Sequence, residues 1–254
     1  MRRVIVTGAS SGIGAALARE YGSTGALLGL IARREADLHA LAGKLSTPFQ
    51  IFALDVRNSA ALRAAAASFI SRHGCPDIVI ANAGVSTGTL TEQPEDLAAF
   101  QDVLDINVVG MLNTFQPFIA AMREAGRGTL VGIASVAGYR GLPGAAAYSA
   151  SKAAAISYLE SLRVELRASG IKVITICPGY IATPMTAANP YPMPFILSAD
   201  TAARAIVKII DRGKTFAVIP WQIAIVARVL RLLPNWLYDR LFNNAPRKPR
   251  LPRK

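Results

Sequence analysis

A tyrosine and a lysine four residues apart have the spacing of an acid–base pair. Tyr148 and Lys152 are the groups suited to proton chemistry in the alanine-rich segment AAAYSASKAAA, residues 145–155. Residues four apart on a helix share a face, so the ammonium can lie beside the phenol. A positive charge there favours the phenolate and lowers the pKa of the tyrosine. Alone, such a pair is more often an ordinary surface feature, so the catalytic interpretation depends on its surroundings.

Two polar residues elsewhere could complete a proton-transfer site. Ser135 follows an apolar run in GIASVAG, and its hydroxyl could hold a substrate oxygen while Tyr148 exchanges a proton with that oxygen. Asn107 stands in DINVVG, within an otherwise apolar helical segment, and could complete a relay to Lys152 through water. The sequence therefore predicts four catalytic residues: Asn107, Ser135, Tyr148 and Lys152.

A glycine-rich loop leads into the first predicted helix. The segment TGASSGIG covers residues 7–14 and begins where the apolar run RVIVT ends. Its glycines let the backbone turn tightly and approach a diphosphate, while the helix N-terminus presents unpaired N–H groups to the anion. The spacing GxxxGxG differs from the common GxGxxG fingerprint, and a plain structural turn is the alternative. The predicted phosphate loop comprises Gly8, Ser10, Ser11, Gly12, Ile13 and Gly14.

Two arginines follow the second predicted strand, where a carboxylate would accept hydrogen bonds from ribose hydroxyls. Arg33 and Arg34, in IARRE, suit a 2′-phosphate, so NADP(H) is predicted in preference to NAD(H). The alternative is that both are solvated surface charges. Residues that end the next two strands should reach the same cofactor, because ligands collect at that edge of an open parallel sheet. They are Asp55, Val56, Asn82, Ala83 and Gly84.

The elements that position these groups alternate along the chain between short apolar runs and longer helical patterns. The apolar runs are nearly continuous, as expected of parallel strands covered on both faces. They occupy residues 3–7, 26–32, 49–55, 77–83, 128–135, 171–179 and 215–220. Helical periodicity occupies residues 12–22, 34–45, 59–74, 94–126, 148–170 and 198–213, the last capped by Ser198. The alternation predicts an α/β fold with a parallel sheet of about seven strands.

Together, TGASSGIG, NAG, Asn107, Ser135, YSASK and PGYIAT resemble the short-chain dehydrogenase/reductase family over about residues 3–220. The resemblance implies a single Rossmann-like, doubly wound sheet with helices on both faces, and NAD(P)-dependent interconversion of a carbonyl and an alcohol. It implies that Tyr148 is the general acid for reduction and that Lys152 lowers its pKa and binds the nicotinamide ribose. It also implies that Ser135 orients the carbonyl and that Asn107 supports the relay. The segment expected to hold the carboxamide contributes Pro178, Gly179, Ile181 and Thr183.

The segment after Thr183, PMTAANPYPMPFILSAD, holds several prolines and is predicted to form a loop at the substrate end. It contains no Arg or Lys to hold an anionic substrate, so a hydrophobic carbonyl or alcohol, such as a lipid-like compound, is favoured. The alternative is that its side chains merely pack the loop. The predicted substrate-binding residues are Ser135, Tyr148, Met185, Tyr191, Met193 and Phe195.

Charge divides the 254-residue chain into a nearly neutral body and a basic end. Residues 204–254 hold twelve Lys/Arg against two Asp/Glu, which accounts for most of the net charge of +12. We expect a catalytic domain over residues 1–220, an apolar and basic helical segment over 221–244, and a disordered tail over 245–254. The segment from Trp221 is too short to span a bilayer. This segment could lie on an anionic membrane surface, or it could pack on the sheet or on a second subunit. A homo-oligomer, either a dimer or a tetramer, is expected.

Composition also limits the remaining functions. Cys75 and Cys177 have no spacing suited to a metal or a disulfide framework, and no export signal precedes the first strand. A cytoplasmic protein is therefore expected, either free or peripheral on the inner face of a membrane. A nucleic-acid binder would rest on charge alone, so no specific nucleic-acid partner is predicted. A non-catalytic NAD(P)-binding sensor remains the alternative to an enzyme, although a sensor need not retain a complete proton relay.

Overall fold

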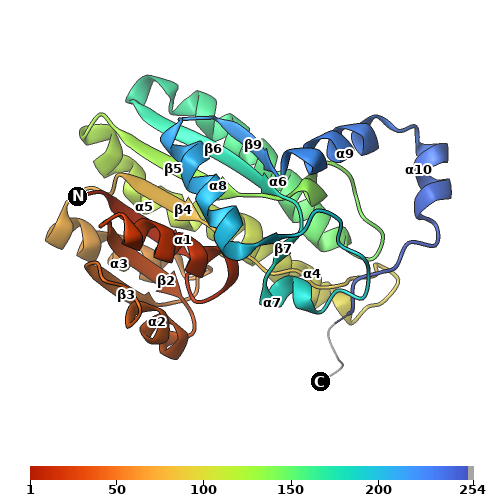
Figure 1. The fold of residues 1–254 in the computed structure, drawn as a ribbon, viewed down its shortest axis with the longest axis horizontal. Coiled ribbons are helices and arrows are strands. Elements are labelled where there is room, and N and C mark those ends of the chain that lie inside the picture. The colour runs from red at the N-terminus through yellow and green to blue at the C-terminus, as the bar shows by residue number, and fades with distance from the viewer. Residues whose placement is uncertain (251–254) are drawn as a thin grey trace.

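A sheet of seven parallel strands, in the order β3-β2-β1-β4-β5-β6-β9, forms the centre of the protein (Figure 1). This computed structural model describes residues 1–250. The strand order reverses between β1 and β4, where open sheets of this kind bind ligands. The strands are β1 (Arg3–Thr7), β2 (Leu27–Ala32), β3 (Phe49–Ala53), β4 (Ile78–Ala81), β5 (Gly128–Ile133), β6 (Ile171–Pro178) and β9 (Phe216–Ile219). The predicted doubly wound parallel sheet is confirmed.

One face of the sheet is covered by α1 (Gly12–Ser23), α2 (Glu35–Ala42) and α8 (Ala199–Asp211). Alternate residues of β1, Val4 and Val6, are fully buried on this side. Helix α8 begins as predicted, because the Ser198 hydroxyl accepts from the Thr201 N–H at 3.2 Å. Such a cap satisfies one of the free N–H groups at a helix start. Helices α1 and α8 pack side by side, with α1 over β1 and β2 and α8 over β6 and β9.

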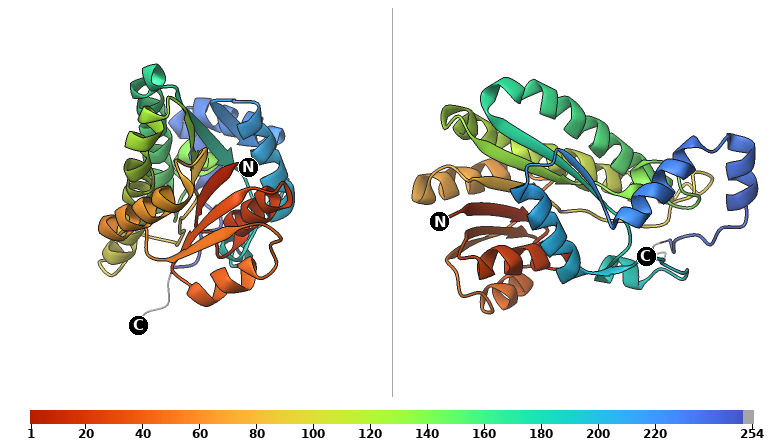
Figure 2. Two further views of the ribbon diagram at one scale, coloured as in Figure 1. Left: turned by 90° about the vertical axis from the view of Figure 1, so that its left-hand side faces the viewer. Right: turned by 45° about the horizontal axis from the view of Figure 1, so that its top comes forward.

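The opposite face is covered by α3 (Ser59–His73), α4 (Asp96–Leu104), α5 (Gly110–Glu124) and α6 (Ala146–Glu165). Figure 2 shows the two helical layers on either side of the sheet. A π-helical turn, η1 (Asp105–Val109), joins α4 to α5. The three elements together form the long helix that was predicted over residues 94–126. Within residues 1–250 the stretch Asp96–Glu124 alone is long and apolar enough to cross a membrane. Here Phe115 and Phe118 bury it against the sheet.

Short elements connect the larger helices and strands. They are η2 (Val136–Gly138), η3 (Arg167–Ser169), β7 (Ile181–Ala182), α7 (Pro184–Ala187) and β8 (Leu197–Ser198). Strand β7 pairs in parallel with β8, so the proline-rich segment between them is closed at its base. The predicted loop differs at α7, because Pro184 at the first helical position and a Thr183–Thr186 capping box favour one helical turn.

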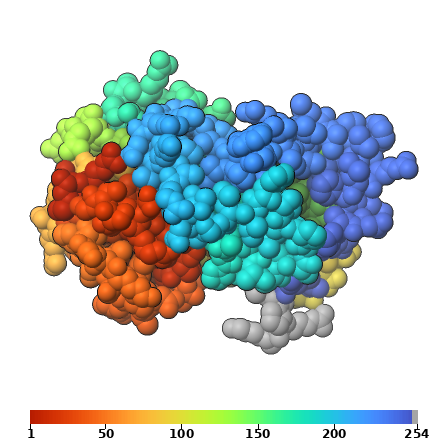
Figure 3. Space-filling model, in the orientation of Figure 1, coloured from red at the N-terminus to blue at the C-terminus, as the bar shows by residue number. Residues whose placement is uncertain are grey.

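Two helices, α9 (Trp221–Leu232) and α10 (Asn235–Phe242), follow the last strand and form one end of the molecule (Figure 3). Arg140, from the loop after η2, connects them to the body. Its guanidinium donates to the carbonyls of Leu230 at 2.9 Å and Leu233 at 2.7 Å, at the end of α9. The same group lies 4.1 Å from the centre of the Tyr238 ring in α10. The carbonyls that a helix C-terminus leaves free are therefore satisfied by a cation.

The prediction of a disordered tail from residue 245 is wrong for residues 245–250. Residues 243–250, here called the C-terminal tail, turn back from α10 toward α4 (Figure 1). The Gly88 N–H donates to the Pro249 carbonyl at 2.9 Å, and Arg250 forms ion pairs with Glu95 and Asp96. The physical reason is that these specific contacts outweigh the charge and proline content on which disorder was predicted. Residues 251–254 of the predicted tail lie outside the described part of the chain.

Candidate active site

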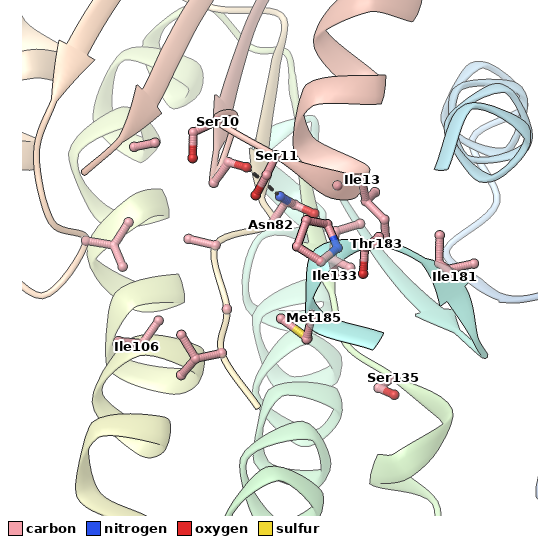
Figure 4. A pocket seen from close by; sticks show the side chains of 18 of the residues that line it. Ser10, Ser11, Ile13, Asn82, Ile106, Ile133, Ser135, Ile181, Thr183 and Met185 are labelled. Carbon is pink, nitrogen blue, oxygen red and sulfur yellow. Dashed lines mark hydrogen bonds between the residues drawn. The ribbon is translucent and has the colours of Figure 1, made fainter. Parts of the chain in front are cut away.

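The main cavity, with a volume of about 340 Å³, lies at the carboxyl ends of the central strands. Figure 4 shows residues that line it, from Ser10 and Asn82 at one end to Ser135 at the other. Loops that are far apart in sequence meet here because parallel strands all end at one edge of the sheet. Twenty of the predicted residues line it: Gly8, Ser10, Ser11, Gly12, Ile13, Arg33, Arg34, Asp55, Val56, Asn82, Ala83, Gly84, Ser135, Tyr148, Lys152, Pro178, Gly179, Ile181, Thr183 and Met185.

The glycine loop leaves no room for side chains. Gly8 and Gly12 have φ of +67° and +55°, a region that residues with a Cβ rarely adopt. A Cβ on Gly14 would lie 2.2 Å from the Gly8 carbonyl oxygen, and one on Gly8 would lie 2.9 Å from the Ala83 Cα. Gly14 therefore supports the loop from behind and does not line the cavity. The N-terminus of α1, which begins at Gly12, is thereby open to a diphosphate.

Thr7 holds the glycine loop against the end of β4, a role that the sequence did not indicate. Its fully buried hydroxyl accepts from the N–H groups of Asn82 at 3.1 Å and Ala83 at 3.2 Å. The Asn82 side chain returns a hydrogen bond to the Thr7 carbonyl at 2.9 Å. The available signal was a threonine at the end of a buried strand. The other lining residues not predicted are mostly apolar strand ends and neighbours: Ala32, Leu54, Val85, Ile106, Ile133, Ala134, Pro184 and Thr186.

The predicted arginine pair lies at the mouth of the cavity. Arg34 donates to the Ser10 hydroxyl at 3.2 Å and pairs with Asp37 at 2.7 Å, while Arg33 lies 3.8 Å from Asp55. Both side chains are more than half exposed, so they can reorient toward a phosphate. Arg57 binds the Asp55 carboxylate at 2.8 Å and holds the pKa of that carboxyl below its usual range. Asp55 is thus an already neutralised carboxylate at this end of the cavity.

Tyr148 and Lys152 lie in the first two turns of α6, as the four-residue spacing requires. The Lys152 ammonium lies 5.8 Å from the centre of the Tyr148 ring and donates to the Ile133 carbonyl at 2.8 Å. Burial lowers the pKa of Lys152 to about 8. Burial also raises the pKa of Tyr148, while the neighbouring Ser135 hydroxyl acts in the opposite direction. Desolvation of the phenol is thus the larger effect on its pKa here, and the lowering by Lys152 stays a prediction.

Ser135 caps the short helix η2 at the end of β5. Its side-chain oxygen accepts from the Ala137 N–H at 3.1 Å, which fixes the hydroxyl at the cavity wall. The residue is buried apart from the surface that it presents to the cavity. Because Ser135 and Tyr148 line the same cavity, one substrate oxygen could accept from both hydroxyls.

Asn107 does not line the cavity and lies behind it, in the π-helical turn η1. Its side-chain oxygen accepts from the Val85 N–H at 2.8 Å, and its amide donates to the Val85 carbonyl at 3.0 Å and to the Ser151 hydroxyl at 2.9 Å. A π turn is a common irregularity at functional sites. Asn107 thus holds the loop after Gly84 against α6, beside Tyr148 and Lys152. The water-mediated relay stays a prediction.

The predicted substrate residues are brought together only in part. Met185 lines the main cavity, and Tyr191 lines a second cavity of about 300 Å³ beside it. Neither Met193 nor Phe195 reaches either cavity, and Phe195 is 52% exposed. The second cavity is lined by Leu142, Pro143, Ala145, Tyr180, Tyr191, Pro192, Phe242, Ala245, Pro246 and Lys248.

Lys248, which lines the second cavity, and its partner Ser86 were not predicted from the sequence. The Lys248 ammonium donates to the Ser86 hydroxyl at 2.8 Å and lies 5.9 Å from the centre of the Tyr148 ring. The segment after Thr183, on which the predicted substrate class rested, contains no Lys or Arg. The charge arrives from the C-terminal tail, and no local pattern connects these distant parts of the chain.

Comparison with known proteins identifies the family to which the chain belongs. The family model described as short chain dehydrogenase matches residues 2–192. An uncharacterized oxidoreductase of Myxococcus xanthus is 39% identical over 94% of this chain and 95% of the relative. A protein of Sesamum indicum named 11-beta-hydroxysteroid dehydrogenase A is 29% identical over 97% of this chain and 77% of the relative. The chain belongs to the short-chain dehydrogenase family of oxidoreductases.

Solved structures have the same architecture. A short-chain dehydrogenase of Streptomyces avermitilis superposes with a TM-score of 0.80 at 26% identity, over 95% of this chain and 96% of that chain. A 3-ketoacyl-(acyl-carrier-protein) reductase of Brucella melitensis, complexed with NADH, gives a TM-score of 0.77 at 26% identity, over 85% and 94%. The Rossmann-like fold predicted from the motifs is therefore confirmed.

Proposed function

We propose that the protein is an NADP(H)-dependent oxidoreductase that interconverts a carbonyl and a secondary alcohol on a hydrophobic small molecule. The observation that carries this proposal is the main cavity, which joins the glycine loop to Tyr148, Lys152 and Ser135 without interruption. One end has the N–H groups and close backbone approach that a diphosphate needs, and the other has a proton donor. A binding protein without turnover would need only the first end.

The residues present fit a nicotinamide dinucleotide. The backbone around Gly8 and Gly14 is packed so closely that a side chain at either position would collide with it, as close binding of a diphosphate requires. Arg33 and Arg34 at the mouth of the cavity support a 2′-phosphate on the ribose. Binding of NADH by the Brucella relative supports the cofactor class. The preference for NADP(H) rests on the two arginines of this chain.

The chain's own residues supply the proton and the orientation for the reaction. A bound nicotinamide cofactor supplies or accepts the hydride. In reduction, Tyr148 donates its phenolic proton to the carbonyl oxygen, and the Ser135 hydroxyl holds that oxygen by a hydrogen bond. The raised pKa of Tyr148 keeps the proton available at neutral pH. The Lys152 ammonium, 5.8 Å from the ring centre, then stabilises the tyrosinate that remains until solvent replaces the proton.

The apolar lining of the second cavity supports a hydrophobic substrate. Leu142, Pro143 and the rings of Tyr180 and Phe242 surround it, next to the cavity that contains Tyr148. Such concave, mostly apolar sites bind the hydrophobic body of a ligand. The relative named 11-beta-hydroxysteroid dehydrogenase A and the structure of a 3-ketoacyl-(acyl-carrier-protein) reductase support this substrate class.

A panel of carbonyl compounds tests turnover, cofactor and substrate class together. Aliphatic, aromatic and steroid ketones and a sugar ketose would be incubated with NADPH or NADH, and alcohol formation would be measured by mass spectrometry. We expect reduction of hydrophobic ketones with a lower KM for NADPH. Cofactor binding without any turnover would support the sensor alternative, and a preference for the ketose would exclude the hydrophobic substrate class.

A further inference from the structure

The C-terminal tail is held at the active site by a defined set of contacts. Arg250 binds Asp96, the first residue of α4, through its Nε at 2.8 Å and its Nη2 at 3.0 Å. The Asp96 carboxylate also accepts from the Leu90 N–H at 2.8 Å, so a contact that does not involve the tail orients it as well. A two-point pair between a guanidinium and a carboxylate defines orientation as well as distance. The residues just before Arg250 are therefore held in a fixed position.

Two glycines provide the space through which the tail passes. A Cβ on Gly88 would lie 2.2 Å from the Lys248 carbonyl oxygen, and a Cβ on Gly144 would lie 2.7 Å from the Arg247 Cβ. Gly144 also has φ of +72°, which other residues rarely adopt. The loops on both sides of the tail thus have glycine where any side chain would collide with the tail.

Lys248 is the cation that this path brings to the catalytic tyrosine. Its ammonium lies 5.9 Å from the centre of the Tyr148 ring, close to the 5.8 Å of Lys152. Lys248 lines the second cavity, while its partner Ser86 follows Gly84 of the main cavity by two residues. Lys248 therefore lies where the two cavities adjoin.

The charge of Lys248 has no carboxylate partner in the described chain. Within residues 1–250 the ion pairs of the tail are those of Arg250, and Lys248 donates to a neutral serine hydroxyl. A lysine ammonium carries three N–H donors, so further acceptors can bind to it. Burial lowers the pKa of Lys248, as expected of a cation without a negative partner. A ligand carboxylate would supply the missing charge.

We propose that Lys248 and Ser86 bind a carboxylate of the substrate, so that the enzyme acts on a hydrophobic keto acid or the corresponding hydroxy acid. This inference rests on the proposed function, since it extends the same site. One ammonium and one hydroxyl match a singly charged carboxylate, whereas phosphate sites generally gather several cationic donors. Because the Lys248 ammonium lies 5.9 Å from the centre of the Tyr148 ring, we expect the acid to stand a few bonds from the carbonyl. The aromatic lining of the second cavity takes the hydrophobic body.

Matched acids and esters test the proposal. The probes are benzoylformate and benzoylpropionate, aromatic keto acids that differ in the spacing of carbonyl and acid, and their methyl esters. In the full-length protein with NADPH, we expect at least one acid to be reduced with a higher kcat/KM than its ester. In Lys248→Met, the KM for that acid should rise at least about tenfold while the ester changes little, because one charge-assisted hydrogen bond is lost.

Controls separate the charge from the fold of the tail. Lys248→Arg should retain the preference for the acid, and Arg247→Met makes the same chemical change at the neighbouring exposed position and should have no effect. Circular dichroism and thermal melting would confirm that each variant is folded. If Lys248→Met changes kcat/KM equally for the acid and its ester, the proposal is overturned. This includes an equal increase for both, which would show that Lys248 merely obstructs the cavity.

A binding measurement keeps this test independent of turnover. Binding of both acids to the cofactor-loaded protein would be measured by calorimetry for the wild type and for Lys248→Met. If neither acid is reduced but one binds at least about tenfold more weakly to the variant, the carboxylate site stands and the proposed reaction fails for these compounds. If neither acid binds the wild type, or if both proteins bind equally, the carboxylate site is excluded.

Discussion

Lys152 approaches Tyr148 without making a hydrogen bond to it: the ammonium lies 5.8 Å from the ring centre and donates to the Ile133 carbonyl. The pair therefore interacts through space, across the wall of the main cavity. Burial keeps the phenol protonated and lowers the pKa of the amine to about 8. The resting site thus holds a proton on Tyr148, ready for donation, and a desolvated cation that gains a partner once that proton leaves.

Loss of the phenolic proton should stop the reaction and leave binding intact. In Tyr148→Phe we expect kcat to fall roughly a hundredfold to ten-thousandfold, because the general acid is removed. Binding of NADPH, followed by fluorescence, should stay near the wild-type level. Tyr158→Phe is the matched control, since Tyr158 lies on the same helix and lines neither cavity. Near-normal turnover by Tyr148→Phe would remove the catalytic assignment.

Removal of the buried cation should stabilise the fold. The folded-state pKa of Lys152 is about 8 against a usual 10.5, so the charged form is disfavoured by folding. Lys152→Met should raise the free energy of unfolding at pH 7 by up to about 3 kcal/mol, while turnover is lost.

The pH dependence of this effect follows from the direction of the shift. Between about pH 8 and 10.5 the unfolded wild type binds more protons than the folded form, so wild-type stability rises relative to the variant in this range. Urea unfolding of the cofactor-free proteins at pH 7 and at higher pH measures the difference. Lys208→Met, on the exposed side of α8, is the control. A variant less stable than the wild type at pH 7 would contradict the expectation.

The arginine pair should determine the choice of nucleotide. Replacing Arg33 and Arg34 by Gln should raise the KM for NADPH roughly 10- to 100-fold, because hydrogen bonds from charged donors to the 2′-phosphate are lost. The KM for NADH should change much less. Steady-state kinetics with both nucleotides measures the ratio, and Arg63→Gln on the exposed face of α3 controls for net charge. Equal effects on both nucleotides would show that neither guanidinium binds the phosphate.

The exposed face of α9 should form an interface with a second copy of the chain. Trp221, Ile225, Val229 and Leu232 form one stripe along the helix and are 67%, 52%, 53% and 83% exposed. Contiguous exposed apolar surface of this kind generally marks an interaction site. We expect the protein to sediment as a dimer or tetramer and the double substitution Val229→Asp, Leu232→Asp to sediment as a monomer.

A control on another helix and a test of membrane binding distinguish the alternatives. Val164→Asp changes another exposed apolar residue, 61% exposed on α6, and should leave the assembly unchanged. A monomeric wild type that co-sediments with anionic vesicles, and loses that binding in the double variant, would replace the subunit contact by a membrane contact. Point substitutions are preferable to truncation here, because truncation would also remove Lys248 from the active site.

The parts of the site that the sequence predicted are those with a local signal. The Tyr148–Lys152 spacing, the glycines before α1 and the polar residues at strand ends each combine a residue type with a position in one element. Parallel strands then bring those ends together without further information. The fold was predictable for the same reason, since each strand and helix has its own periodicity.

The remaining features arise from contacts between distant segments. Lys248 and Ser86 are 162 positions apart, and Arg140 reaches the end of α9 some 90 positions later. Neither contact leaves a pattern in either segment. The raised pKa of Tyr148 was also missed, because spacing indicates a neighbouring charge but not the amount of protein that covers the phenol. The π turn that contains Asn107 has no recognised sequence signature, and it appeared only as part of a long helix.

The anchoring of Arg250 to Asp96 has a practical consequence for handling the protein. A fusion partner or affinity tag at the carboxyl end follows the C-terminal tail that carries Lys248, so we expect it to disturb the wall of the second cavity. Met1 precedes β1 at the amino ends of the strands, and it lines neither cavity. Immobilisation, labelling or purification through the amino end should therefore leave substrate preference unaltered, whereas the same tag at the other end should change it.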